Sequence, residues 1–168
     1  MIHYISAERL TIARVEEILT KGYKLALSED AVKRITHCRE YLDQKTKTVG
    51  RPIYGVTTGF GSLCNISVEE EGLSQLQKNL MMSHACGTGQ RVPSEIARLM
   101  ILLKVQSLSY GHSGVQLLTV ERLIEMFNNN IIPVVYEHGS LGASCDLSPL
   151  AHMCFSLLGL GRVEIDGE

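Results

Sequence analysis

Three short segments combine glycine residues with side chains that can carry chemistry. They are residues 54–61, which begin with Tyr54; the pair Ser83-His84, which precedes Ala-Cys-Gly; and residues 142–150, in which serine, cysteine and aspartate are adjacent. Tyrosine and histidine can transfer protons, and serine and cysteine can act as nucleophiles. These residue types make a catalytic site one hypothesis; the other is that the glycines only form tight turns.

The glycine patterns do not match a phosphate-binding loop. Residues 54–61 contain no lysine and do not form GxxxxGK[ST], and residues 87–89 do not complete GxGxxG. The sequence around them shows no strand–helix–strand pattern, which these motifs require. Nucleotide binding is therefore not favoured.

The cysteines and histidines near the C-terminal end allow two other kinds of site. Ser144 or Cys145 can pair with His152 or His138 in nucleophilic catalysis, but Ser144 does not stand in a G-x-S-x-G elbow. A zinc site from Cys145, His152 and Cys154 lacks the usual tight ligand spacing. Such residues in an apolar helix are more often core residues, so neither site is preferred.

The spacing of apolar residues predicts a mainly α-helical chain with short extended segments. Ser28 is expected to cap one helix, and Ser67 with Glu70 has the form of a capping box before another. Pro133 argues against a central strand, whereas Pro149 is tolerated in a first helical turn. Helices are expected over residues 10–19, 28–42, 67–84, 93–108, 115–127 and 147–158, extended segments over 23–27, 131–136 and 162–165, and loops over 46–53, 54–61 and 137–146.

The composition fits one globular unit over residues 1–168. The chain is 45% hydrophobic with a net charge of −2 and scattered Lys and Arg, which argues against disorder and against nucleic-acid binding. We see no signal peptide and no apolar run of roughly 18 residues, so we expect no membrane association. Five widely spaced cysteines, an odd number, favour a reducing cytoplasmic location over a disulfide framework.

Three ordered motifs resemble the histidine/phenylalanine ammonia-lyase family. Gly139-Ser-Leu-Gly-Ala-Ser-Cys-Asp-Leu-Ser-Pro-Leu-Ala-His-Met153 is similar to the family pattern G-S-x-G-A-S-G-D-L-x-P-L-A-H. Tyr54-Gly-Val-Thr-Thr-Gly-Phe-Gly61 resembles the Y-G-x-x-T-G-F-G loop, and Asn79-Leu-Met-Met-Ser-His-Ala-Cys-Gly-Thr-Gly89 resembles the histidine-lyase form of the next motif. The resemblance extends from about residue 10 to residue 167 and implies the helical lyase fold with glycine-rich active-site loops.

The resemblance implies a cofactor made from the chain itself. In this family an Ala-Ser-Gly tripeptide cyclises, with loss of two waters, to 4-methylidene-imidazole-5-one (MIO). Ala143, Ser144 and Cys145 occupy the matching positions. The electrophile makes the substrate amine a better leaving group, and the protein supplies the base and the electrostatics. Tyr54 matches the catalytic tyrosine, and Asp146 is expected to hold backbone amides or to cap the next helix.

The same resemblance implies the substrate. His84 matches the position that recognises the substrate side chain, and Ser83 and Gly61 are the other expected substrate-binding residues. Ser-His is typical of histidine lyases, where phenylalanine lyases have Phe-Leu and tyrosine lyases have His-Leu. Two neutral imidazoles can hydrogen-bond because each offers one donor and one acceptor. Elimination of ammonia from L-histidine to give trans-urocanate is expected, with no metal; a tyrosine lyase or aminomutase is the alternative.

The sequence departs from the family in two ways. Cys145 stands where the family has glycine, and a side chain there narrows the allowed backbone angles, so ring formation should be slow or incomplete. Ring loss would leave a non-catalytic protein that binds amino acids or other chains. Family members are also much longer and form homotetramers with sites drawn from three subunits. We therefore expect an N-terminal segment of such a fold, inactive alone, with the tripeptide near Tyr54 and His84.

Overall fold

The computed structural model describes residues 1–142 and 145–167, and within them the chain is mainly helical, as predicted. The α-helices are α1 (Ile12–Thr20), α2 (Glu29–Thr48), α3 (Glu70–His84), α4 (Ser94–Leu108), α5 (Leu117–Asn128) and α6 (Ser148–Phe155). Short 3-10 helices lie before α3, at η1 (Gly61–Leu63), and directly after α6, at η2 (Ser156–Leu158). The strands are β1 (Ile2–Ile5), β2 (Lys24–Leu27), β3 (Thr88–Arg91), β4 (Ile131–Pro133), β5 (Tyr136–His138), β6 (Leu141–Gly142), β7 (Cys145–Asp146) and β8 (Val163–Ile165).

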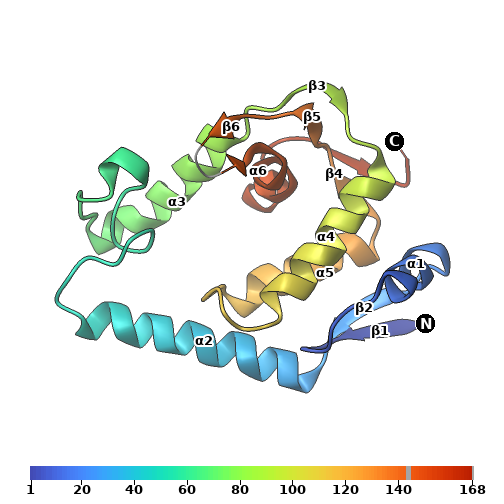
Figure 1. Cartoon of the computed structure of the whole chain (residues 1–168), viewed down its shortest axis with the longest axis horizontal. Coiled ribbons are helices and arrows are strands. Elements are labelled where there is room, and N and C mark those ends of the chain that lie inside the picture. The colour runs from blue at the N-terminus through green and yellow to red at the C-terminus, as the bar shows by residue number, and fades with distance from the viewer. Residues whose placement is uncertain (143–144, 168) are drawn as a thin grey trace.

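The strands form four two-stranded ribbons rather than one sheet. β1 pairs with β2 in parallel, while β3–β5, β4–β8 and β6–β7 are antiparallel. Pro133 ends β4, which pairs only with β8 in the described chain, in agreement with the expectation that it would not lie in a central strand. The β3–β5 ribbon brings the segment after α3 against the segment that leads to the β6–β7 hairpin (Figure 1).

The hydrophobic core lies where α4 and α5 face each other, with β2, β4 and α6 around them (Figure 1). Its fully buried side chains include Ile101, Leu102, Val105, Val120, Leu123, Phe127 and Met153. The β1–β2 ribbon is attached to this core by the side-chain amide of Asn128. Asn128 accepts a hydrogen bond from the backbone N–H of Leu25 (2.7 Å) and donates one to its carbonyl (2.9 Å).

Helix α3 is the least buried of the long helices. None of residues 71–84 is fully buried, and the helix reaches away from the core while contacting α6 (Figure 1). The apolar residues predicted on one face, Leu73, Leu76 and Leu80, are half-buried. One end of α3 therefore carries a loop away from the core, and the other end returns to it.

Two helix boundaries differ from the sequence predictions. The prediction that residues 46–53 form a loop is wrong for residues 46–48, because α2 continues to Thr48. The hydroxyls of Thr46 and Thr48 donate hydrogen bonds to backbone carbonyls about one helical turn earlier. The capping box at Ser67 is also wrong: α3 is capped at Glu69, and Ser67 forms an isolated β-bridge with Thr58. Ser28 caps α2 as predicted, its hydroxyl accepting from the N–H of Ala31 (3.2 Å).

Candidate active site

Cys145, the third residue of the predicted tripeptide, begins β7 in the β6–β7 hairpin. Leu141 pairs with Asp146 and Gly142 pairs with Cys145, so the two strands flank residues 143 and 144. The predicted ring residues Ala143 and Ser144 themselves lie outside the described residues. Cys145 is exposed and has a φ of 63°, a left-handed conformation that costs a side-chain-bearing residue free energy and that glycine adopts freely.

Asp146 holds the backbone on both sides of the hairpin. Its Oδ1 accepts hydrogen bonds from the N–H groups of Ser140 and Ser148, each at 3.1 Å. The first bond fixes the entry to β6, and the second fixes the first residue of α6. The carboxylate therefore holds two backbone amides, whereas the N-cap of α6 is Leu147, whose side chain makes no capping hydrogen bond.

His84 ends helix α3 with its ring bonded to its own helix. Its Nδ1 lies 2.8 Å from the carbonyl oxygen of Leu80, and the Ser83 hydroxyl donates to the same oxygen (2.9 Å). Because a carbonyl can only accept, Nδ1 carries the proton in this bond. In the neutral ring Nε2 is then left with a lone pair and can accept a hydrogen bond from a ligand.

Tyr54 stands on a loop that is organised by a buried threonine. Thr58 is 1% exposed, and its hydroxyl accepts from the N–H of Gly55 (3.3 Å) and donates to the carbonyl of Gly59 (2.9 Å). The Tyr54 side chain is 63% exposed, and its hydroxyl accepts only a long hydrogen bond from the N–H of Gly61 (3.4 Å). The phenol is therefore presented to the outside of this chain.

The structure brings some of the predicted residues together and leaves others apart. The loop with Tyr54 and Gly61 lies at the N-terminal end of α3, whereas His84 and the β6–β7 hairpin lie toward its C-terminal end (Figure 1). Helix α3 has 15 residues and is about 22 Å long at 1.5 Å per residue. Because Ala143 and Ser144 lie outside the described residues, the expected approach of Tyr54 to the tripeptide stays a prediction.

The described residues do not assemble the other candidate sites, and Ser144 lies outside them. In the described residues no three His, Cys, Asp or Glu side chains gather as metal ligands, so Cys145, His152 and Cys154 make no zinc site. His152 Nε2 is engaged with the N–H of Gly87 (2.9 Å) rather than with a cysteine or serine. The one sequence signal for this contact is the glycine at position 87, where a side chain would meet His152.

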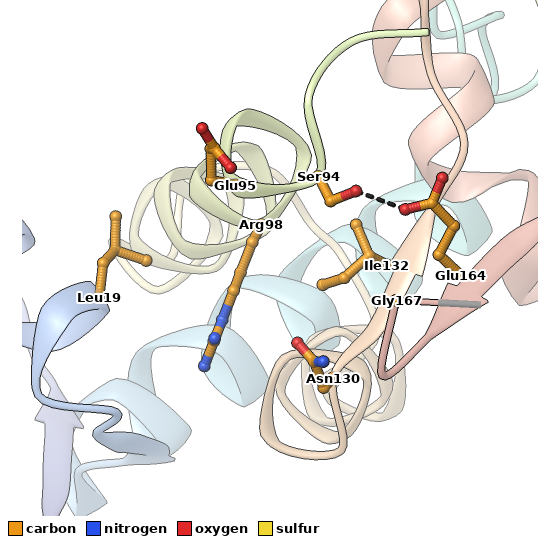
Figure 2. Close-up of a pocket in the computed structure, with 8 residues that line it drawn as sticks. All are labelled: Leu19, Ser94, Glu95, Arg98, Asn130, Ile132, Glu164 and Gly167. Atoms are coloured by element: carbon orange, nitrogen blue, oxygen red, sulfur yellow. Dashed lines mark hydrogen bonds between the residues drawn. The ribbon is translucent and has the colours of Figure 1, made fainter.

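Two cavities lie away from these residues. One of about 270 Å³ is lined by Leu19, Ser94, Glu95, Arg98, Asn130, Ile132, Glu164 and Gly167. Figure 2 shows Ser94 hydrogen-bonded to Glu164 across it. The Arg98 guanidinium lies 4.5 Å from the centre of the Phe127 ring. The second cavity, of about 990 Å³, is mostly apolar and lies beside α5 and η2. The second cavity includes Cys154, and neither cavity contains a residue of the predicted lyase site. In the described part of the chain, no helix is long and apolar enough to cross a membrane.

The fold is that of known helical lyases and aminomutases. Tyrosine aminomutase from Streptomyces globisporus superposes with a TM-score of 0.90 at 32% identity, over 100% of this chain and 31% of that protein. Histidine ammonia-lyase from Trypanosoma cruzi gives a TM-score of 0.87 at 33% identity, over 99% of this chain and 32% of that protein. The predicted fold class is confirmed.

Sequence comparison gives the family. The aromatic amino acid lyase family model matches residues 10–168, so the chain belongs to this family. Histidine ammonia-lyase from Caldanaerobacter subterraneus subsp. tengcongensis is 46% identical over 164 residues, and that from Clostridium tetani is 43% identical over 164 residues. Each alignment covers 98% of this chain and 32% of the relative, so the chain spans about a third of the length of these relatives.

Proposed function

We propose that the chain supplies the tripeptide-bearing part of a histidine ammonia-lyase, which converts L-histidine to trans-urocanate and ammonia. The observation that supports the proposal is the β3–β5 ribbon, which pairs the segment that follows Ser83-His84 with the segment that leads to the β6–β7 hairpin. The names of the relatives at 43–46% identity support the histidine substrate.

The described residues around the tripeptide fit an MIO group. Ring closure needs a tight backbone turn at the third residue, and Cys145 already has a positive φ. Its side chain is exposed, so the added bulk has space beside the turn. When formed, MIO supplies an electrophile that takes up the substrate amine and makes it a better leaving group.

The chain's own side chains have three roles in this proposal. Asp146 holds the hairpin and the start of α6 together through its two N–H bonds, and the positive end of α6 faces developing negative charge. His84 offers Nε2 to the N–H of the substrate imidazole. Tyr54 exchanges a proton with the substrate as catalytic acid or base.

Tyr54 performs this role in the site of a neighbouring copy. Tyr54 precedes α3, whereas the β3–β5 ribbon that leads to the hairpin follows it, and its side chain is 63% exposed, which leaves it accessible to another copy. A homotetramer with sites shared between subunits, in the cytoplasm, accommodates this arrangement.

A chimera tests the proposed reaction. Residues 1–168 replace the aligned N-terminal segment of the Caldanaerobacter relative, and urocanate release from L-histidine is measured by ultraviolet absorbance. We expect activity in the chimera, none in its Ser144→Ala form, and an intact mass lower by two waters only when Ser144 is present. A folded chimera of native size with the full mass and no urocanate would contradict the proposal.

Complementation tests the shared site. Chimeras with Tyr54→Phe or Ser144→Ala are each expected to be inactive, and co-expression is expected to restore activity. A restored site combines the tyrosine of one copy with the tripeptide of the other. If Tyr54 acted within its own chain, every site in the mixed assembly would lack one of the two groups and no activity would return.

Two other functions have specific support. Cys145 in place of the family's glycine favours a non-catalytic protein that binds amino acids or other chains, and an unchanged mass in the chimera would identify it. Similarity to tyrosine aminomutase at a TM-score of 0.90 favours tyrosine as substrate. Assaying L-tyrosine beside L-histidine separates this function from the proposed one.

A further inference from the structure

His152 makes a hydrogen bond that no catalytic role explains. It lies on α6, and its Nε2 accepts from the backbone N–H of Gly87, 65 residues earlier in the chain, at 2.9 Å. The ring is held edge-on by Tyr136 (centroids 5.2 Å apart) and by Phe155 (6.3 Å). An imidazole fixed on two sides and aimed at one N–H is positioned to hold that backbone segment.

The partner residue has no room for a side chain. A Cβ added to Gly87 would lie 2.9 Å from His152 Nε2, closer than real Cβ atoms come, and 3.0 Å from the hydroxyl oxygen of Ser148, which is a very tight contact. The Ser148 hydroxyl is buried and lacks a hydrogen-bond partner among the described residues. Glycine at position 87 is therefore what lets the backbone approach α6 closely enough for the bond.

The contact joins the two parts of the proposed site. Gly87 comes three residues after His84, and Ser148 comes one helical turn before His152. Ser148 donates its N–H to Asp146, which follows Cys145 directly. The His152–Gly87 bond thus connects the segment that carries His84 to the helix that is tied to the tripeptide hairpin.

We propose that neutral His152 is a positioning residue that holds the His84–Gly87 segment against the tripeptide hairpin. The inference rests on the proposed lyase site for its functional meaning. The bond requires a lone pair on Nε2, and protonation replaces that lone pair with an N–H that faces the N–H of Gly87. Charging the ring therefore releases the segment.

The surroundings favour the neutral ring. Burial lowers the pKa of His152 below 6.5. Tyr136 is the titratable group in ring contact. The other titratable groups on elements that contact α6 include His84 and Lys78 on α3, Glu137 and His138 on β5, and Glu95, Arg98 and Lys104 on α4.

Amide hydrogen exchange of this chain tests the inference, with Gly87 protection measured by NMR between pH 8 and pH 4. We expect His152→Leu, similar in size but without an acceptor, to lower the Gly87 protection factor about tenfold at pH 7.5. His152→Gln, whose amide oxygen can accept in the place of Nε2, should keep protection across the whole range. The unmodified chain should lose protection as the pH falls below 6.5. His112→Gln, at an exposed position, serves as control.

The pH profile separates positioning from mere packing. Rescue by glutamine together with loss of the pH dependence identifies the Nε2 lone pair as the essential feature, and the His84 ring resonances should shift in His152→Leu but not in His152→Gln. Unchanged Gly87 protection in a folded His152→Leu variant, or protection of the unmodified chain that is independent of pH, would overturn the inference. Neither readout depends on urocanate release, so a failed lyase assay leaves this test intact.

Discussion

The two glycine-containing loops of the proposed site are held in place by different means. The loop at residues 54–61 is organised from within, by the buried Thr58 hydroxyl and its bonds to Gly55 and Gly59. The β6–β7 hairpin is held through residues outside it, because its Asp146 accepts hydrogen bonds from Ser140 and Ser148 and the β3–β5 ribbon and α6 flank it. A self-contained loop can present Tyr54 to another chain, whereas an anchored hairpin suits a group that must stay fixed relative to its own core.

The largest expected effect tests the contact that holds Gly87 against α6, the helix that follows the β6–β7 hairpin. Gly87→Ala places a Cβ against His152 and Ser148, so we expect a loss of about 2 kcal/mol in the free energy of unfolding, measured by urea denaturation. Gly50→Ala is the matched control, because a Cβ there meets nothing within 4 Å. Equal stability of the two variants would show that α6 does not hold this segment tightly.

The next effect tests the internal organisation of the other loop. Thr58→Val keeps the shape but leaves the N–H of Gly55 without its acceptor, which should cost about 1–2 kcal/mol. The measurement is the rate of proteolysis within residues 54–68, which should rise in Thr58→Val. Thr48→Val, on the exposed end of α2, is the control. Gly87 amide exchange should not change; a coupled change would mean that the two loops are not independent.

A smaller effect of opposite sign is expected at the hairpin. Cys145→Gly removes the cost of a side chain at a φ of 63°, partly offset by the greater freedom of glycine in the unfolded chain, for a net gain of about 1 kcal/mol. Thermal unfolding measures the gain, and intact mass measures whether ring formation becomes more complete. A lower melting temperature would show that Cys145 makes stabilising contacts.

The smallest effect is a dependence of stability on pH. The folded-state pKa of His152 lies below 6.5 because the ring is buried, so the unfolded chain binds more protons in this range. The contribution is present above pH 6.5 and is lost progressively as the pH falls from there through the folded-state pKa. His3, whose pKa is lowered by burial and by Arg14, acts in the same direction. Urea denaturation at pH 8 and pH 5 should show a weaker dependence in His152→Gln.

Much of the fold could be predicted from local sequence. Ser28, Gly22, Pro93 and Pro149 mark helix ends through backbone chemistry that acts within a few residues, and these boundaries agree with the structure. The Ser67 capping box failed because a tertiary contact, the bridge to Thr58, competes for the same residue. A sequence pattern alone cannot show which of the two contacts is made.

The candidate site was predicted only through its resemblance to a family. Periodicity placed His84 at a helix end and the tripeptide before α6, but nothing in the spacing shows that α3 separates Tyr54 from the hairpin. The bond from Gly87 to His152 spans 65 residues and involves a backbone N–H, which has no sequence signature of its own. The sequence predicts only that Gly87 follows the end of a helix, which gives its location but not its close approach to α6.

The bonds from Asn128 to Leu25 have a consequence for self-association. A two-stranded parallel ribbon leaves backbone groups unpaired along its outer edges, and such edges invite strands of other molecules to add. The Asn128 amide occupies both the N–H and the carbonyl of Leu25, in the middle of one edge. A single side chain from α5 therefore blocks the register that an incoming strand would need, and helps to keep this ribbon from seeding aggregates.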